Sequence, residues 1–580
     1  MSKSVIILGG GVAGLSAAHE LLHRGFIVKV FEHKPVPGGK ARSVLFKGSG
    51  TDGRADLPGE HGFRFFPRFY KHLPQTMKEI PLGNGKTVFD NLVDATRIYV
   101  ARYDAPGIVM SSRFPRSLAD LEVILKDMFD TNYGLKPGEA KIFARKIWQL
   151  MTSCPERRLT EYEKIGWWDF IEATGKSEAY QTLLASGLTR TLVAAQPKLA
   201  STRTGGDIML QLMFDIATPG GSSDRVLNGP TNDVWINPWL KYLHERFKNN
   251  FEYHLDHELE DIFCDTVNKK ITKVTVKKLT RDTNHIITAK SNAIEVTGDY
   301  FIAALPVEIM ADKVTGDMLK VDPTLENIKT LKPSVSWMNG IQFYLNKNVK
   351  IDHGHTIYVN TQWALTSISQ IQFWQNFDIA KHGNGKVKGI LSVDVSDWYA
   401  KGLIQQKEAR NCSRQEIKDE IWAQLKKSLN YQEEILKDEY LETWFLDPDI
   451  LTPDEDRPHE NVNLEPLLVN RAGTWALRPT AHTLISNFML ASDYVQTYTD
   501  LATMEGANEA ARRAVNSIIQ DSGVEQPYCQ IWNLHEPDIL AIWRWADKEK
   551  FDKGLPWDGK ISFFRNLRIR IKLLFKKIVG

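Results

Sequence analysis

Three glycines near the N-terminus have the spacing of a loop that holds the phosphates of a dinucleotide. Gly9, Gly11 and Gly14 form a G-x-G-x-x-G motif directly after the apolar run at 5–8. The first glycine of such a motif permits a tight turn, the second lets the backbone approach a pyrophosphate, and the third lets a helix pack on the preceding strand. The chemistry indicated is therefore the binding of a pyrophosphate by backbone N–H groups.

A helix, a second strand and an acid give this motif its structural context. A helix is expected over about 13–24, so that its positive dipole end faces the phosphates, and Val12 and Ala13 in this turn are expected to bind the cofactor. A second strand over 27–31 ends at Glu32, whose carboxylate can accept hydrogen bonds from ribose hydroxyls. Strand, glycines, helix, strand and acid in this order predict a dinucleotide-binding fold rather than a glycine-rich turn without a ligand.

A second glycine-rich segment follows the acid. Residues 37–42 read P-G-G-K-A-R, in which Gly38 and Gly39 let the backbone pass close to a cofactor. Lys40 or Arg42 can offset the charge of a pyrophosphate. A Gly-Gly pair alone is equally typical of an ordinary turn, so this segment gains its meaning from the motifs around it.

Three more segments complete a family pattern. They are E-H-G-F-R-F-F at 60–66, N-F-M-L-A-S-D-Y at 487–494, and M-E-G-A at 504–507, which opens a helix. Together with the N-terminal motifs they resemble the superfamily of FAD-dependent amine oxidases and phytoene desaturases. They are most similar to the plant-type phytoene and zeta-carotene desaturases and to the hydroxysqualene dehydroxylases. The resemblance covers the cofactor-binding segments clearly and the rest of the chain only in general layout.

The resemblance implies roles in FAD binding for residues from both ends of the chain. Glu60 and Gly62 belong to the segment that approaches the flavin ring, and Gly62 is the position without a side chain at the ring. Asp493 binds the ribityl or pyrophosphate portion, although Ser492 replaces the glycine that usually precedes it. Leu259 lies in a segment beside the adenine. The backbone that meets the ribityl chain and the isoalloxazine is that of Met504, Glu505, Gly506 and Ala507.

Two polar residues are the candidates for catalysis. His61 and Arg64 lie in the segment that approaches the ring, and a histidine there could act as acid or base near neutral pH. The alternative is a surface loop in which these side chains only pack. No metal site is expected, because the cysteines are too dispersed for a zinc knuckle.

Length and composition restrict the class and the compartment. The chain has 580 residues, of which 42% are hydrophobic, so it is too long for one small core and too apolar for disorder. Its net charge of +2 gives no global attraction to nucleic acid, and no nucleic-acid partner is expected. No apolar run reaches the roughly 18 residues needed to span a bilayer. The four dispersed cysteines fit a reducing compartment, and we therefore expect a cytoplasmic protein.

The order of the motifs predicts an α/β fold with a discontinuous FAD-binding domain of the Rossmann type, as in amine oxidases, and an inserted α+β substrate domain. We assign the FAD-binding domain to 1–75, 226–310 and 476–525, the substrate domain to 76–225 and 311–475, and a C-terminal tail to 526–580. The stretch 447–466, rich in proline and acid, is interpreted as a surface loop. Sixteen tryptophans would suit a lipid tunnel, although tryptophans packed in a core are commoner.

Basic charge is concentrated at the C-terminus. Residues Lys560 to Gly580 contain seven lysines or arginines and no acid. Apolar residues recur there at three- and four-residue spacing and predict an amphipathic helix with the stripe Phe564, Leu567, Ile571, Leu574 and Ile578. Such a helix can lie on an anionic membrane surface with its basic side chains at the headgroups, which would make the protein peripherally membrane-associated. Docking on the core of the protein itself is the alternative.

The resemblance and the tail together favour a FAD-dependent oxidoreductase that acts on an apolar lipid. Hydride transfer to flavin N5 during isoprenoid or carotenoid desaturation is the leading reaction. The electron acceptor is left open between a quinone and oxygen. Other functions also stay open: a redox-neutral isomerase or dehydroxylase of lipids, an amine oxidase, or a non-catalytic binder of prenylated proteins of the GDP dissociation inhibitor type.

Overall fold

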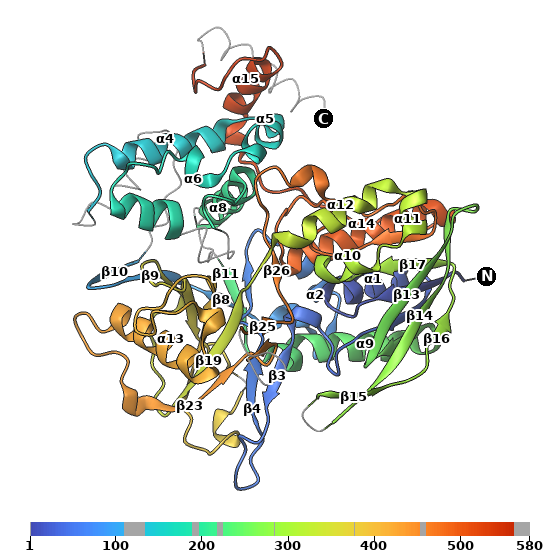
Figure 1. Cartoon of the computed structure of the whole chain (residues 1–580), viewed down its shortest axis with the longest axis horizontal. Helices are drawn as coiled ribbons and strands as arrows, with labels where there is room; N and C mark the ends of the chain where they lie inside the picture. The colour runs from blue at the N-terminus through green and yellow to red at the C-terminus, as the bar shows by residue number, and fades with distance from the viewer. Residues whose placement is uncertain are drawn as a thin grey trace.

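The computed structural model describes residues 2–109, 134–187, 196–216, 224–282, 285–375, 377–452 and 460–561. These residues form two halves, one built on a parallel sheet and one built on a larger, mostly antiparallel sheet (Figure 1). Each half is assembled from segments far apart in the sequence, because the chain crosses between the halves several times.

A five-stranded parallel sheet with the order β12-β2-β1-β17-β27 forms the centre of the first half. Its central strands are buried, as expected where helices cover both faces of a parallel sheet. The strands are β1 (Ser4–Leu8), β2 (Ile27–Phe31), β12 (Phe251–His254), β17 (Tyr300–Ala303) and β27 (Phe488–Leu490).

Two helices from opposite ends of the chain pack side by side on this sheet. They are α1 (Val12–His23) and α14 (Met504–Ser522), drawn in blue and orange in Figure 1. Gly11 is the N-cap of α1, and Thr503 is the N-cap of α14, where its Oγ1 accepts the N–H of Gly506 at 3.1 Å. Helix α14 ends at Gly523, whose φ of +64° favours glycine.

An antiparallel sheet and four helices complete this half. The sheet contains β13 (His257–Asp265), β14 (Lys270–Arg281), β15 (Ile287–Lys290) and β16 (Ile294–Val296). The helices are α9 (Asn237–Phe247), α10 (Val307–Lys313), α11 (Gly316–Val321) and α12 (Glu326–Leu331).

The second half is organised around a seven-stranded sheet with the order β10-β9-β20-β21-β22-β19-β23. Helix α13 (Arg414–Leu429) covers one face, where Ile417, Ile421 and Leu425 pack against apolar side chains of the sheet. The strands are β9 (Arg97–Arg102), β10 (Ala105–Val109), β19 (Asn339–Leu345), β20 (Gly354–Tyr358), β21 (Leu365–Ser369), β22 (Gly389–Val395) and β23 (Leu441–Leu446).

A small three-stranded sheet lies against the other face of the large one. It consists of β5 (Phe65–Pro67), β11 (Asp224–Leu227) and β8 (Leu92–Ala95). Val226 of the small sheet shares a hydrophobic cluster with Ile368 and Ile390 of the large sheet. The hairpin of β3 (Ser43–Phe46) and β4 (Leu57–Glu60) leads the chain from the parallel sheet to this interface.

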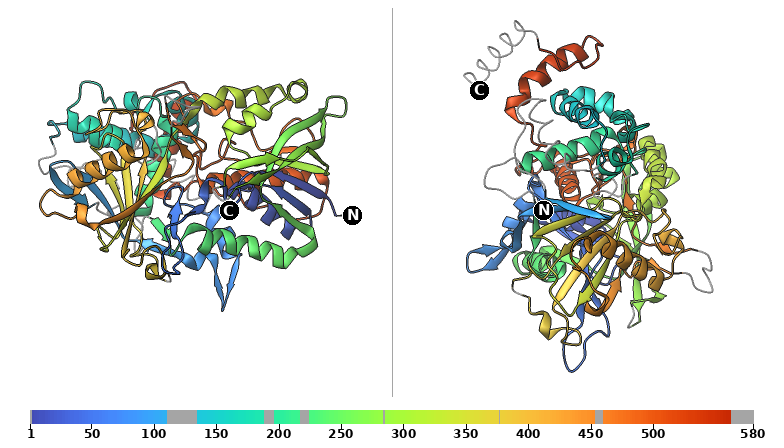
Figure 2. Two further views of the ribbon diagram at one scale, coloured as in Figure 1. Left: turned by 60° about the horizontal axis from the view of Figure 1, so that its bottom comes forward. Right: turned by 90° about the vertical axis from the view of Figure 1, so that its left-hand side faces the viewer.

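Helices gather at one end of the second half. They are α4 (Glu139–Thr152), α5 (Pro155–Thr160), α6 (Trp167–Phe170), α8 (Thr202–Ile216) and α15 (Ala541–Phe551). Figure 2 shows α15, in red, beside the cyan helices at this end. Residue Asp547 of α15 pairs with Arg157 of α5 at 3.0 Å, and both side chains are buried.

The predicted fold class is confirmed, and the first two strands and the first helix lie within one residue of their expected bounds. The surface-loop prediction for 447–466 is wrong for its described ends, because Asp447 and Asp449 are 0% and 5% exposed and pair with buried cations. The predicted amphipathic helix lies outside the described residues beyond 561. None of the helices in the described ranges combines the length and the apolar composition that a membrane span requires. All four cysteines are free thiols.

Candidate functional site

The turn between β1 and α1 has the backbone geometry that its glycines predict. Gly9 has φ +100°, and a Cβ there would lie 2.5 Å from the carbonyl oxygen of Ala304. A Cβ at Gly14 would lie 2.0 Å from the carbonyl oxygen of Gly9. Neither position can carry a side chain without moving backbone, so both glycines are required by the close packing of turn, strand and helix.

The two glycine motifs lie against each other. Gly11 forms a parallel bridge with Gly38, and the nearest atom to a Cβ at Gly11 would be the Cα of Gly39 at 3.5 Å. This is ordinary van der Waals contact, so Gly11 is not required by packing within the protein. Its lack of a side chain leaves the N-terminus of α1 accessible, which is what a pyrophosphate bound at backbone N–H groups needs. The segment 37–42 could not be distinguished from a simple turn by its sequence. Its contact with Gly11 places it beside the first glycine motif.

Glu32 lies at the carboxyl end of β2, beside the turn. Its Oε2 accepts the N–H of Gly10 at 2.7 Å and its Oε1 accepts the N–H of Lys34 at 2.8 Å. Burial raises the pKa of this carboxyl although both backbone hydrogen bonds oppose the rise. The Tyr253 hydroxyl donates to the carbonyl oxygen of Gly10 at 2.7 Å and fixes the turn from the neighbouring strand β12. The acid is thus held rigidly where ribose hydroxyls could reach its remaining lone pairs.

Lys40 and Arg42 already have carboxylate partners within the chain. Lys40 Nζ lies 2.9 Å from Glu308 Oε1, and Arg42 forms a buried ion pair with Asp449. Lys34 bridges Asp449 at 3.1 Å and Glu465 at 2.7 Å. These contacts give both cations partners within the chain, and their role as counter-ions of the pyrophosphate stays a prediction. Backbone N–H groups and the dipole of α1 would meet the phosphate charge as well.

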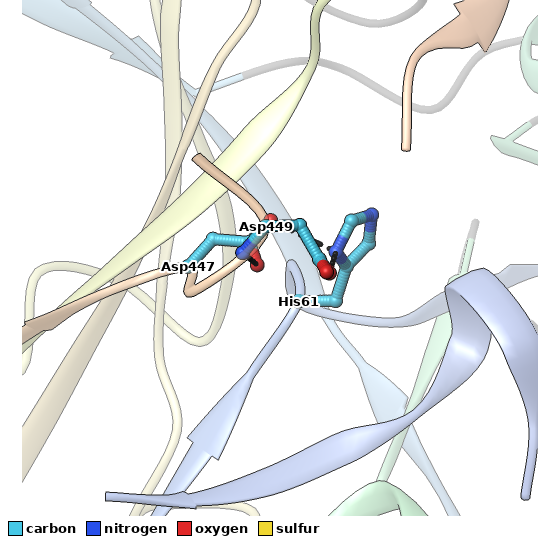
Figure 3. A group of neighbouring side chains, drawn as sticks. All are labelled: His61, Asp447 and Asp449. Carbon is cyan, nitrogen blue, oxygen red and sulfur yellow. Dashed lines mark hydrogen bonds and ion pairs between the residues drawn. The ribbon is translucent and has the colours of Figure 1, made fainter. Parts of the chain in front are cut away.

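His61 belongs to the same buried ionic cluster. Its Nδ1 lies 2.8 Å from Asp447 Oδ2 and 3.4 Å from Asp449 Oδ2 (Figure 3). Burial lowers the pKa of His61, but the two carboxylates outweigh burial and raise that pKa to about 9. His61 is therefore a cation at neutral pH and has no lone pair to serve as a base. The predicted role as a base is not supported, whereas donation of a hydrogen bond or proton stays a prediction.

The three side chains His61, Asp447 and Asp449 also have the spacing of metal ligands, within 4.8 Å of one another. Their charges are balanced without an ion, because Arg42 and Lys34 pair with Asp449 and the Nδ2 of Asn339 donates to Asp447 at 2.6 Å. A divalent cation there would have to compete with side chains already in place.

Gly62 is placed against protein atoms on one side. A Cβ on Gly62 would lie 2.9 Å from Asp394 Oδ1, and a Cβ on Gly340 would lie 2.8 Å from the Cα of Gly62. The segment that contains Gly62 therefore lies directly on β19 and β22 of the large sheet. This contact gives a second reason for glycine at this position besides the flavin ring that the family resemblance implies.

Glu60 and Arg64 line a small cavity between the small and large sheets. Both oxygens of Glu60 accept hydrogen bonds of 2.9 Å from Thr231, one from its N–H and one from its hydroxyl. Burial raises the pKa of Glu60 to about 7, and the charge of Arg64 limits the rise. Arg64 Nη2 donates to the carbonyl oxygen of Lys40 at 2.6 Å, while its buried Nε has no partner within the described residues.

The C-terminal motif contributes a strand end and a helix start. Asp493 is half-buried beyond the end of β27, where the Ser492 hydroxyl donates to its Oδ1 at 3.3 Å. Serine therefore fits where the family usually has glycine. Met504, Gly506 and Ala507 form the first turn of α14 with their backbone N–H groups at its positive end. Leu259 is a buried residue of β13 within the core of the first half.

Glu505 has a structural task that the sequence did not reveal. Its carboxylate accepts the N–H groups of Lys71, His72 and Leu73 at 2.7–2.9 Å, at the start of α2 (His72–Lys78). It also pairs with Nδ1 of His72 at 2.7 Å. Burial opposes ionisation, but these donors outweigh burial and lower the pKa of Glu505. The side chain of Glu505 thus faces α2, and only its backbone is available to a cofactor.

Sequence reasoning missed several buried polar groups of the large sheet and its loops. Asp394 is 6% exposed in β22, and His355 is 7% exposed in β20. Burial raises the pKa of Asp394 to about 7, and the charges of Arg64 and His61 limit the rise. The sequence contains a sign of Asp394, because it interrupts the apolar strand L-S-V-D-V at 391–395. An ionisable residue in such a strand is expected to have a partner or a function.

The two glycine motifs and the Rossmann-type sheet define a protein of the class that binds a dinucleotide at a helix N-terminus. The model of the family described as flavin-containing amine oxidoreductase matches residues 12–186 and 266–519, well over half of the chain. The chain belongs to this family. FAD as the cofactor and a FAD-dependent oxidoreductase as the class of enzyme, both predicted from the motifs, are confirmed at the level of the family.

Individual relatives are more distant. A carotenoid phi-ring synthase of Chlorobaculum tepidum is 39% identical over 69 residues, which are 12% of this chain and 10% of that protein. The chain thus spans about a tenth of the length of this curated relative. Putrescine oxidase bound to putrescine has a TM-score of 0.56 at 14% identity, over 90% of this chain and 99% of the other. Cyclohexylamine oxidase from Brevibacterium oxydans IH-35A has the same TM-score at 13% identity, over 90% and 100%. These two structures share the fold.

Proposed function

We propose that this protein oxidises an apolar lipid, and that isoprenoid or carotenoid desaturation is its reaction. The observation that carries the proposal is the lining of the cavity beside Glu60 and Arg64. Six of its residues are apolar or aromatic: Phe63, Val226, Leu227, Ile368, Phe373 and Trp374. The cavity itself has a volume of about 20 Å³, room for about one water molecule, so its walls support an apolar surrounding and do not give the size of the substrate. The short match to a carotenoid phi-ring synthase also supports a carotenoid-like substrate.

The charged groups at this cavity do not favour an amine. Glu60 is the carboxylate in the lining, and Thr231 already donates to both of its oxygens. Arg64 supplies a positive charge in the same lining, which would repel an ammonium group. Glu60 and Arg64 lie in one lining, so the cavity does not present an unpaired negative charge to a cationic substrate.

The residues of the chain would hold FAD and prepare its surroundings. Bound FAD supplies an acceptor for a hydride. The turn at 9–14 would hold the pyrophosphate and Glu32 a ribose, while the N-terminus of α14 would stabilise negative charge on the reduced ring. His61, as a buried cation, adds positive charge to the segment that approaches the ring. The protein would align the lipid and exclude water.

Anaerobic reduction of the bound flavin tests this function. The holoprotein would be mixed with phytoene in phosphatidylcholine vesicles, and in parallel with putrescine, while the flavin absorbance is followed. We expect bleaching by phytoene and none by putrescine. Bleaching by the amine alone would establish amine oxidation instead. Conversion of the lipid without bleaching and without an electron acceptor would indicate a redox-neutral isomerase or dehydroxylase.

The predicted membrane contact belongs to the same proposal. The basic tail Lys560 to Gly580 would bring the enzyme to an anionic membrane surface, where an apolar substrate and a quinone are both dissolved. Oxygen is the alternative electron acceptor. Reoxidation of the bleached flavin by a water-soluble quinone under nitrogen, compared with reoxidation by air, distinguishes the two.

A further inference from the structure

A tyrosine of the edge strand β12 reaches the turn that carries the first glycine motif. Tyr253 is the third residue of β12, and its hydroxyl donates to the carbonyl oxygen of Gly10 at 2.7 Å. The contact is close, because a Cβ on Gly10 would lie 2.1 Å from Tyr253 Oη. In the sheet, β2 lies between β12 and β1. The side chain therefore joins the carboxyl ends of strands that are not neighbours, at the edge of the sheet where dinucleotides bind.

The same hydroxyl also meets the second glycine motif. Burial raises the pKa of Tyr253 well above its usual value, the charge of Glu32 raises that pKa further, and a hydrogen bond from the backbone N–H of Gly38 opposes the rise. The hydroxyl therefore stays protonated, and it donates to Gly10 while it accepts from Gly38. Gly38 in turn forms the parallel bridge with Gly11. One side chain thus contacts both glycine motifs at the point where they meet.

The hydrogen bond to Gly10 fixes the direction of a backbone donor. The described residues contain no cis peptide bond, so the carbonyl of Gly10 and the N–H of Gly11 point in opposite directions within one plane. Because the carbonyl points at Tyr253, the N–H of Gly11 points away from it. Glu32 Oε2 holds the preceding peptide by accepting the N–H of Gly10 at 2.7 Å. Gly11 is the N-cap of α1, so its N–H belongs to the backbone donors that a phosphate meets at this helix N-terminus.

We propose that Tyr253 is a positioning residue for the pyrophosphate of FAD, because its hydroxyl holds the peptide between Gly10 and Gly11 in the orientation that directs the N–H of Gly11 to the phosphate. The inference needs FAD as the cofactor and does not depend on the lipid substrate. A peptide between two glycines rotates freely when nothing holds it. Without the hydroxyl, phosphate binding has to order this peptide first, and the entropy lost in that ordering lowers the affinity.

The second glycine motif has anchors of its own, so it does not need Tyr253 to stay in place. The side chain of Asn232, 8% exposed, holds both ends of the motif. Its Nδ2 donates to the carbonyl oxygen of Pro37 at 3.1 Å, and its Oδ1 accepts the N–H of Ser43 at 2.7 Å. Removal of the Tyr253 hydroxyl should therefore leave the segment 37–43 and the fold intact. An effect on FAD binding can then be separated from unfolding.

The experiment compares the holoprotein of Tyr253→Phe, which lacks one hydroxyl group, with the wild-type holoprotein. Each is diluted stepwise, and the rise in flavin fluorescence as FAD dissociates gives the Kd for FAD. We expect the Kd to rise about 3- to 10-fold, the effect of losing one neutral hydrogen bond. Circular dichroism should show the wild-type fold. Tyr528→Phe is the matched control, because Tyr528 is 60% exposed, and its Kd should equal that of the wild type.

A second readout separates positioning from a contribution to the fold alone. The ³¹P resonances of bound FAD report the surroundings of its two phosphates. At least one of them should shift in Tyr253→Phe, and neither should shift in Tyr528→Phe. A hydroxyl that only stabilises the fold would leave both resonances in place.

An unchanged Kd in Tyr253→Phe, or a raised Kd with both ³¹P resonances at their wild-type positions, would overturn the proposal. Neither measurement uses a lipid or turnover. Failure of the wild type to bleach with phytoene would therefore contradict the proposed function and leave the role of Tyr253 unaffected.

Discussion

Nδ1 of His61 lies 2.8 Å from Oδ2 of Asp447, although 385 residues separate them along the chain, by the numbering of the sequence. Arg42 and Lys34 join the same cluster through Asp449. The cluster ties the cofactor-binding half to the segment after β23 of the large sheet. It therefore links the two halves of the molecule at the segment that contains His61.

The cluster makes stability depend on pH in a defined direction. Because the pKa of His61 is raised to about 9 in the folded state, its stabilisation is complete below the unfolded value near 6.5 and is lost as pH rises through about 9. Asp447→Asn should flatten this slope and remove on the order of 3 kcal/mol from the free energy of unfolding at pH 6.5. Urea unfolding of the holoprotein between pH 6 and pH 10 measures both effects.

The control for this prediction is His482→Asn. Its imidazole also lies 3.0 Å from a carboxylate, that of Asp521, but its side chain is 50% exposed. The slope should change less in His482→Asn than in Asp447→Asn, because solvent screens an exposed pair. An unaltered slope in Asp447→Asn would show that the cluster does not set the charge of His61.

Gly11→Ala separates cofactor binding from folding. A methyl group there meets Gly39 at an ordinary 3.5 Å but occupies the approach to the N-terminus of α1. We expect a folded protein whose affinity for FAD falls at least about tenfold, which corresponds to about 1.4 kcal/mol. The ratio of flavin absorbance to protein absorbance measures it, and circular dichroism verifies the fold. Gly316→Ala, where a Cβ has open space, is the control. Full flavin content in Gly11→Ala would contradict the binding of the pyrophosphate at the N-terminus of α1.

Glu505→Gln tests whether this motif residue acts on the cofactor or on the fold. The amide keeps one acceptor oxygen for the N-terminus of α2 and loses the charge, so the free energy of unfolding should fall by about 1–3 kcal/mol. The flavin content should stay stoichiometric, because the side chain of Glu505 faces α2. Glu525→Gln, at an exposed position after α14, should leave both quantities unchanged. Loss of FAD with unchanged stability of the apoprotein would reverse the assignment.

Deletion of 560–580 tests the membrane proposal. Seven basic residues without an acid should give association with phosphatidylserine-containing vesicles that weakens as salt screens the charge. The truncated protein should pellet less with these vesicles, and neither form should pellet strongly with phosphatidylcholine alone. Equal pelleting of the two forms with anionic vesicles would contradict the predicted role of the tail.

The local features of the cofactor-binding half could be predicted from the sequence. Apolar runs, glycine spacing and a terminal acid specify β1, α1 and β2 through interactions between residues near one another, so their bounds differ from expectation by no more than one residue. Family resemblance further linked the M-E-G-A helix start to the N-terminal glycines, and the packing of α14 on α1 brings them together.

Tertiary structure alone decided which charges meet. In the sequence, Asp447 and Asp449 resemble residues of a solvated loop. In the structure they pair with Arg42, Lys34 and His61 of the other half, and this pairing offsets the cost of burying the two carboxylates. Asp224 and His355 are likewise unrelated in the sequence, and only the packing of two sheets brings them within hydrogen-bond distance. Sequence periodicity reports which face of a strand is buried, but the partner on that face depends on strand order and register across the whole chain. The sequence by itself therefore determined the family and the cofactor, and the tertiary structure determined which polar groups are available for chemistry.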